Sequence, residues 1–310
     1  MFFSPGRLRR SLFSISMEET TFARQGFYRG SQQAQEKLYR VVCAFLQGYH
    51  AALEDDHFEV LLPRLQTIDT EFRGFAFEGA AMELAFLDWF FPWKRRLQAF
   101  LQGPGANHIY ELHIGAGWTL GRLPRSATSL MRQFDPLLGW LVIDGYGFHQ
   151  GFFSGRRFLQ DQMLPPGLSG YALRVFDQGL GRSLWFVKGA DASQIITNVK
   201  SFPPFRQGDL WSGIGVACAY AGGGENEAIQ ALCDSAGPYR PYLALGAAFA
   251  AIARKRAGNG VTHTDLTCEM FSGLPCDEVV RLAHESSYGL PRNQFAYEIW
   301  RDRVRTALAR

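Results

Sequence analysis

The most constraining feature of the sequence is a pair of glycines separated by one residue, which recurs along the chain. The pairs are Gly115 and Gly117, Gly145 and Gly147, Gly179 and Gly181, and Gly213 and Gly215. Their first glycines follow one another after 30, 34 and 34 residues. Each glycine destabilises a helix by about 1 kcal/mol, but it lets a neighbouring helix or a ligand approach the backbone closely. We therefore expect the glycines to be contact sites.

The interval of 34 residues is typical of stacked helical hairpins of the tetratricopeptide kind. The sequence matches tetratricopeptide repeats in its period only. The tryptophan, leucine-glycine and tyrosine positions of the tetratricopeptide signature are not reproduced. The sequence predicts an all-α fold, either a tetratricopeptide-like solenoid or a helical bundle, with repeat-like units from about residue 110 to residue 260.

Individual segments also carry helix signals. Residues 32–53 keep apolar side chains at helical spacing, and Asp144 and Asp209 are predicted to be helix N-caps. The glycines at 222–224 are expected to end the second of these helices. In the segment 72–91 the charged residues recur every five positions, so they scatter around a helix instead of forming one polar face. We expect that helix to be buried on all sides.

Composition bounds the class of protein. The chain has 310 residues, 47% of them hydrophobic, and a net charge of +3 that is spread along the sequence, so nucleic acid is not an expected partner. Five cysteines without a close pair argue against disulfides and a cysteine zinc site. No signal peptide and no membrane-spanning segment are expected. We predict a cytoplasmic protein with an N-terminal arm at residues 1–30 and a single helical domain at residues 31–310.

Common catalytic and cofactor motifs are incomplete or missing. The third glycine of a dinucleotide fingerprint comes one residue late, and no phosphate-binding loop, serine nucleophile elbow or zinc-binding histidine pair is present. No cofactor is therefore clearly indicated. Asp55, Asp56 and Glu59 have the spacing with which all-α prenyl-diphosphate enzymes hold magnesium, but the second metal motif of those enzymes is not found. A solvated acidic helix end is the alternative interpretation.

The most polar positions in apolar surroundings are the candidate site residues. Glu78 and Glu83, in the buried segment, need a partner such as Arg182 or a proton. Tyr146 and His149 share a helical face and could transfer a proton, although a buried structural histidine is the competing interpretation. Asp177 and Arg182 could bind an anionic group or each other.

We expect the segments 144–153 and 176–186 to pack side by side and enclose a binding site. The candidate catalytic residues are His149, Tyr146, Asp177, Arg182 and Glu78, and the candidate ligand contacts are Gly145, Gly147, Gly179, Gly181, Trp185 and Trp211.

Seven stretches, in order, resemble a known family. They are residues 7–27, 73–89, 113–125, 141–153, 176–191, 209–223 and 242–259. With them the sequence resembles the UnbL-type family, a bacterial domain of unknown function found with enediyne biosynthesis genes. The resemblance implies a role near the conversion of a linear polyketide polyene into a more elaborate product. It brings no catalytic residue with it.

Three hypotheses follow. The first is an accessory protein of natural-product biosynthesis that binds, and in a stronger form also transforms, an apolar polyene intermediate. The second is a magnesium-dependent cyclase of isoprenoid diphosphates that uses Asp55, Asp56 and Glu59. The third is a helical scaffold for other enzymes of the pathway. An enclosed apolar cavity, converging acids near a basic pocket, and an open groove would distinguish them.

Overall fold

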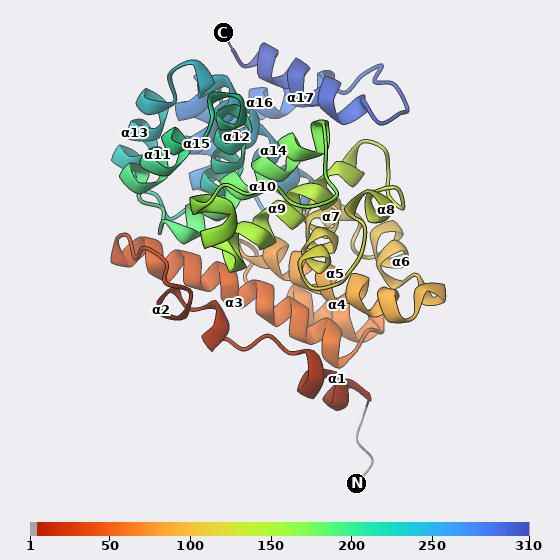
Figure 1. Cartoon of the computed structure of the whole chain (residues 1–310). Coiled ribbons are helices and arrows are strands. Elements are labelled where there is room, and N and C mark those ends of the chain that lie inside the picture. Colours follow the sequence, from red (N-terminus) through yellow and green to blue (C-terminus); the bar gives the residue numbers. More distant parts are fainter. Residues whose placement is uncertain (1–4, 310) are drawn as a thin grey trace.

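The computed structural model describes residues 5–309, and within this range the chain forms helices and no strand. The α-helices are α1 (Pro5–Phe13), α2 (Phe22–Gln25), α3 (Gln32–Glu54), α4 (Phe58–Gln66), α5 (Arg73–Phe90), α6 (Arg96–Gln102), α7 (Ile109–Trp118), α8 (Ala127–Met131), α9 (Leu141–Phe153), α10 (Tyr171–Val187), α11 (Ala192–Ser201), α12 (Pro204–Ala221), α13 (Asn226–Ala236), α14 (Arg240–Ala257), α15 (Thr262–Ser272), α16 (Cys276–Glu285) and α17 (Ala296–Ala307). The predicted all-α class is confirmed (Figure 1).

Seven of these helices form a continuous array, in which α3, α5, α7, α9, α10, α12 and α14 each pack on the next. The contacts at the two ends of α10 and α12 show that these two neighbours run in the same direction. Arg174, near the start of α10, donates to Asp209 in the first part of α12 at 2.9 Å. Trp185, near the end of α10, donates to the carbonyl of Gly222, which follows the end of α12. The segment between α10 and α12, which includes α11, returns the chain from the end of α10 to the start of α12.

The paired glycines explain how the array is so tightly packed. A Cβ at Gly145 would collide with the carbonyl oxygen of Ile114 on α7, the preceding helix of the array. A Cβ at Gly147 would collide with the carbonyl oxygen of Phe176 on α10, the following helix. Residues two positions apart are rotated by about 200° on a helix, so the two glycines face opposite sides. The same rule holds at the other three pairs, where each first glycine meets the preceding helix and each second glycine the following one.

The expected contact role of the glycines is therefore seen at every pair. The tetratricopeptide-like repeat is not confirmed, because the glycine-bearing helices pack directly on one another in the array. The prediction that the helix in segment 72–91 is buried on all sides is confirmed from Gly74 to Leu87, whereas Trp89, Phe90 and Phe91 at its end are exposed. Residues 32–53 form α3, and Gly222 ends α12 with a positive φ of 66°, both as expected.

The N-cap predictions for Asp144 and Asp209 are wrong. Helix α9 begins at Leu141 and α12 begins at Pro204, so both aspartates lie inside their helices. Both carboxyl groups are buried and accept hydrogen bonds from arginine side chains. A sequence pattern cannot distinguish an aspartate that caps a helix from one that a distant guanidinium holds inside it.

The N-terminal segment lies along α3 (Figure 1), although residues 1–4 of the predicted arm lie outside the described residues. Tyr49 on α3 donates to the carbonyl of Phe13 at 2.8 Å, and the Nε2 atom of His50 lies 3.0 Å from the carbonyl oxygen of Ile15. Ile15 is buried in the main core. All five cysteines are free, as expected. Within residues 5–309, no helix combines the length and the hydrophobicity that crossing a membrane requires.

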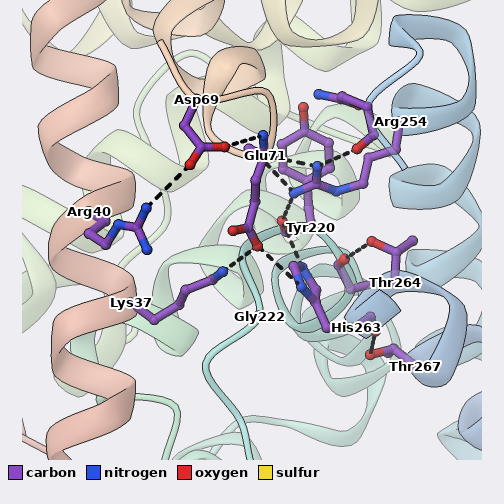
Figure 2. Close-up of polar contacts among 12 residues, drawn as sticks. Lys37, Arg40, Asp69, Glu71, Tyr220, Gly222, Arg254, His263, Thr264 and Thr267 are labelled. Atoms are coloured by element: carbon purple, nitrogen blue, oxygen red, sulfur yellow. Dashed lines mark hydrogen bonds and ion pairs between the residues drawn. The ribbon is translucent and has the colours of Figure 1, made fainter. Parts of the chain in front are cut away.

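Figure 2 shows how the beginning of the array is joined to its far end. Glu71, just before α5, forms an ion pair with Lys37 of α3 and lies 3.5 Å from Nδ1 of His263 on α15. Arg254 of α14 is buried and donates to the backbone carbonyls of Glu71 and Tyr220. Its guanidinium also lies 4.4 Å from the centre of the Tyr220 ring. These contacts fix Tyr220, whose hydroxyl reaches the candidate site.

Candidate functional site

Five successive helices of the array each carry a buried carboxyl group. They are Glu78 on α5, Glu111 on α7, Asp144 on α9, Asp177 on α10 and Asp209 on α12. The first four are 33 residues apart and the last follows after 32. None of these residues exposes more than 4% of its surface. Because burial of an unpaired charge is strongly unfavourable, the partners of each carboxylate determine what it can do.

Two of the carboxylates have guanidinium groups of their own. Asp177 accepts two hydrogen bonds from Arg206, at 2.8 and 2.5 Å. Asp209 accepts hydrogen bonds from Arg174 at 2.9 Å and from Arg301 of α17 at 3.0 Å. These are hydrogen-bonded ion pairs that tie α10, α12 and α17 together. We call Asp177 and Asp209 the outer carboxylates.

The other three carboxyl groups lie around one interior cavity that a single arginine, Arg182, also lines, and we call Glu78, Glu111 and Asp144 the inner carboxylates. Arg182 forms an ion pair with Asp144 and lies 3.9 Å from the Oε2 atom of Glu78. Glu78 also accepts a hydrogen bond from the indole N–H of Trp118 at 2.9 Å. Glu111 accepts one from the hydroxyl of Tyr220, and its Oε1 atom lies 3.6 Å from the Nδ1 atom of His108.

The imbalance of charge in this group has a chemical consequence. Burial raises the pKa of Glu78 to about 7, against the lowering effects of Arg182 and of the Trp118 N–H. A carboxyl group with such a pKa exchanges a proton near neutral pH, which is what a general acid or base requires. Burial alone would lower the pKa of Arg182, but the carboxylates of Asp144 and Glu78 raise it, so the guanidinium stays charged.

Two interior cavities meet at the pair of Glu78 and Arg182, since both residues line both cavities. One, the polar chamber, is also lined by the other inner carboxylates, by Gln178 and Tyr220, and by apolar side chains of α14 and α17. The other, the aromatic chamber, lies on the far side of the pair. Its aromatic lining residues are Phe45, Phe75, Trp118, Phe148, Phe152, Phe153 and Phe186.

Each chamber has a volume of about 40 Å³. A buried water needs about 10 to 15 Å³ of such space, so each chamber accommodates a few small groups. A longer ligand would have to displace the Glu78 and Arg182 side chains that separate the chambers, or the aromatic side chains of the wall. The aromatic chamber also reaches the N-terminal segment, because Ile15 and Thr20 line it.

Two acceptor atoms at the polar chamber have no hydrogen-bond partner among the described residues. They are the Oε2 atom of Glu111 and the Oε1 atom of Gln178. The side-chain amide of Gln178 is oriented by its donor nitrogen, which bonds to Asp144 at 2.7 Å and to the hydroxyl of Tyr297 at 3.3 Å. A buried acceptor without a donor is unfavourable by about 1–3 kcal/mol. A hydrogen-bond donor that reached these atoms would satisfy them, while most of the accessible wall of the chamber is apolar.

The structure brings together some of the residues predicted from the sequence. Glu78 and Arg182 lie at the junction of the chambers, and the expected contact between them is present. Helices α9 and α10 pack side by side, as expected. The expected pair of Asp177 and Arg182 is wrong, because Asp177 binds Arg206 while Arg182 binds Asp144.

Tyr146 and His149 are both buried, but neither lines a chamber. The His149 ring packs against Trp118, with 5.7 Å between the ring centres, and its Nδ1 atom has no hydrogen-bond partner among the described residues. Burial, together with the charge of Arg122, lowers the pKa of His149 to about 3. The imidazole is thus neutral at physiological pH, and proton transfer between Tyr146 and His149 remains a prediction.

The predicted ligand contacts also lie away from the chambers. Gly145, Gly147, Gly179 and Gly181 face backbone atoms of neighbouring helices. Trp185 and Trp211 are buried in the core, where the indole N–H of Trp185 is bound to Gly222. A contact between any of these residues and a ligand remains a prediction.

The alternative metal site lies between α3 and α4. Asp55, Asp56 and His57 place ligand atoms within 4.8 Å of one another, whereas Glu59 is not part of this group. Asp56 is engaged by the guanidinium groups of Arg9 and Arg96. Asp55 accepts a hydrogen bond from the backbone N–H of His57 and lies 2.7 Å from the Nδ1 atom of that ring. Existing partners thus hold both aspartates without a metal ion.

Sequence reasoning overlooked Glu111 and the site roles of Asp144, Gln178 and Tyr220. The signal that could have located the carboxylates is their spacing, because acids 33 residues apart fall within apolar, glycine-containing segments. Tyr220 carries no comparable signal, since its role depends on the contacts between distant parts of the array (Figure 2).

No curated protein and no solved structure matches the chain. A family model does match, and it covers residues 4–308. The chain thus belongs to DUF1702, a family of proteins of unknown function.

Proposed function

We propose that the protein binds an apolar, unsaturated small molecule in its helical interior and holds the polar end of that molecule at the inner carboxylates. The observation that carries this proposal is the meeting of an aromatic chamber and a polar chamber at Glu78 and Arg182. Binding sites for small molecules combine an apolar wall with a few polar groups that fix orientation, and the two chambers supply both. A polyene intermediate of polyketide biosynthesis, which the resemblance to the UnbL-type family implies, has this chemistry.

The polar chamber favours one kind of polar end. Two residues that line it have free acceptor atoms, Glu111 Oε2 and Gln178 Oε1, and the guanidinium of Arg182 is shared by Asp144 and Glu78. A hydroxyl or ammonium group would satisfy these acceptors, whereas a carboxylate would add another negative charge. The proposed ligand therefore ends in a hydrogen-bond donor.

The raised pKa of Glu78 extends the proposal to chemistry. A proton held near neutral pH beside an unsaturated chain could be delivered to that chain or removed from it. In this form of the proposal Glu78 is the acid or base, Arg182 holds it in place, and Trp118 fixes the orientation of its carboxyl group.

The test uses a conjugated tetraene fatty alcohol and the corresponding fatty acid, because the fluorescence of such chains rises when they leave water. Val42 lines the aromatic chamber, and Val42→Phe should fill it. Val60 on α4 is exposed, which makes Val60→Phe the matched control. We expect the alcohol to bind better than the acid, and Val42→Phe to weaken the binding of the alcohol at least about tenfold, while Val60→Phe leaves it unchanged.

Melting temperatures of both variants show whether Val42→Phe is folded at the temperature of the measurement. The proposal fails if the wild-type protein binds neither chain, or if a folded Val42→Phe variant binds the alcohol as well as the wild type does. Solvent extraction of the wild-type protein, followed by absorbance and mass spectrometry, would identify a natural ligand that copurifies with it.

A further inference from the structure

The end of α5 and the turn that follows it expose a row of large aromatic side chains. Helix α5 ends at Phe90, and a short 3-10 helix, η2 (Pro92–Lys94), follows. The exposed fractions are 38% for Trp89, 47% for Phe90, 44% for Phe91 and 70% for Trp93. We call these four residues the aromatic edge. Single exposed aromatic residues are ordinary on a protein surface, but four within five positions form a patch that indicates an interaction site.

The aromatic edge continues onto the N-terminal segment. The ring of Phe13, at the end of α1, lies 6.0 Å from that of Phe90 and 5.1 Å from that of Phe86. Its neighbour in the chain, Leu12, exposes 64% of its surface. The apolar surface is therefore built from two segments that are far apart in the sequence.

Basic side chains accompany the aromatic edge. Lys94 and Arg95 follow it directly and are exposed. The guanidinium of Arg125, from the loop before α8, lies 5.5 Å from the centre of the Trp89 ring. Aromatic rings with adjacent cationic groups are characteristic of protein surfaces that rest on a lipid bilayer, where the rings enter the interface and the cations meet anionic headgroups.

A surface pocket of about 360 Å³ opens beside the aromatic edge, and Arg95, Arg125, Gln98 and Gln133 line it. Neither guanidinium forms an ion pair within the described part of the chain. The acidic residue of this pocket, Asp88, is already engaged, because it accepts hydrogen bonds from the backbone N–H groups of Arg96 and Leu97 at 3.0 and 2.9 Å. Partial burial lowers the pKa of Arg125 against the raising effect of the charge of Asp88, yet neither guanidinium is within ion-pair distance of a carboxylate among the described residues, so both can bind a phosphate group.

From these observations we propose that the protein docks on the surface of a phospholipid bilayer that contains anionic lipids. The aromatic edge enters the interface, and Arg95 and Arg125 receive a headgroup phosphate in the pocket beside it. This proposal does not depend on the ligand of the interior chambers. It explains both the exposed apolar surface and the unpaired guanidinium groups, since a bilayer interface offers an apolar layer below a layer of phosphates.

The test is cosedimentation of the full chain with vesicles of phosphatidylcholine alone and with vesicles that also contain phosphatidylglycerol. We expect stronger binding to the anionic vesicles, with a decrease as salt is added. The double variant Phe91→Ala with Trp93→Ala should lose binding at least about tenfold, because burial of one large aromatic side chain is already worth that factor. Arg95→Glu with Arg125→Glu should remove the preference for anionic vesicles.

The matched control is Phe205→Ala, because Phe205 on α12 is 82% exposed and lies outside the aromatic edge. It should bind anionic vesicles as the wild type does. Absence of binding to both kinds of vesicle would overturn the proposal, and so would equal losses in the Phe205→Ala control and in the double aromatic variant. Size-exclusion chromatography adds a further criterion. A dimer of the wild type that the double aromatic variant abolishes would show that a second copy of the chain occupies this surface.

Discussion

Asp177 and Asp209 each face guanidinium groups of their own, whereas Asp144 and Glu78 share that of Arg182 and Glu111 has no guanidinium partner among the described residues. All five are buried at nearly equal intervals along the same array of helices. The outer carboxylates accept hydrogen bonds from guanidinium groups, so their role is to join α10, α12 and α17, although burial still raises the pKa of Asp177. Among the inner carboxylates, Arg182 pairs closely with Asp144 alone, and the incomplete compensation of Glu78 and Glu111 lowers stability. We interpret these inner carboxylates, whose buried charges are incompletely compensated, as the part of the interior that is retained for function.

The largest expected effect comes from breaking an outer pair. In Arg206→Met the carboxylate of Asp177 stays buried without its guanidinium, and we expect the free energy of unfolding to fall by about 3–5 kcal/mol. Denaturant titration measures this loss. Arg174→Met is the control, because Arg174 is half-exposed and Asp209 keeps Arg301, so a loss below about 1 kcal/mol is expected. Similar losses in the two variants would contradict the assigned role of the Asp177 pair.

An intermediate effect should appear in the pH dependence of stability. The pKa of Glu78 is about 7 in the folded protein and 4.5 for an ordinary glutamate, so the folded state retains a proton that the unfolded state releases between these values. The stability that protonated Glu78 contributes therefore falls as the pH rises from 4.5 to 7, and it is lost above pH 7. From the size of the shift, this loss is on the order of 3 kcal/mol.

Glu78→Gln should remove this contribution, because an amide oxygen can still accept the hydrogen bond from Trp118 and Arg182 keeps Asp144. Glu83, whose pKa burial raises to about 8, keeps its own contribution in both proteins. The variant is therefore expected to be more stable than the wild type at pH 8 and similar to it at pH 4. Thermal unfolding across this range provides the measurement, with Glu59→Gln as an exposed control. If the difference between the wild type and Glu78→Gln does not change with pH, Glu78 is not the titrating group.

The helical fold was accessible from the sequence because it depends on local patterns. The paired glycines, the buried segment of α5 and the stop at Gly222 all appear as short-range signals. The partners of the buried charges were not accessible, since they depend on which helices become neighbours. Asp144 has the sequence context of an N-cap, but in the array it pairs with Arg182. Asp177 was predicted to pair with Arg182, five residues away, whereas it pairs with Arg206.

The candidate site was found in part for the same reason. Glu78 was detectable because a carboxyl group stood within a segment that had no polar face. Glu111 occupies a comparable segment of α7, but it becomes notable only through its 33-residue distance from Glu78 and Asp144. The paired glycines were predicted to be ligand contacts, because glycine lets another group approach the backbone closely. That group can be a ligand or another backbone, and in this structure it is the backbone of the neighbouring helix.

The smallest expected effect on stability distinguishes the two groups of carboxylates most directly. In Glu111→Gln the side-chain oxygen can still accept the hydrogen bond from Tyr220, and the atom that is replaced, Oε2, has no partner among the described residues. We therefore expect the free energy of unfolding to change by less than about 1 kcal/mol. The matched change in the outer group, Asp209→Asn, leaves Arg301 buried without a carboxylate and should be several times more destabilising.

Denaturant titration of both variants measures this difference in stability, and a binding assay with the tetraene alcohol tests whether Glu111 contributes to the site. Glu111→Gln should weaken that binding, because an acceptor at the polar chamber becomes a donor, whereas a variant with unchanged stability and unchanged binding would remove Glu111 from the site.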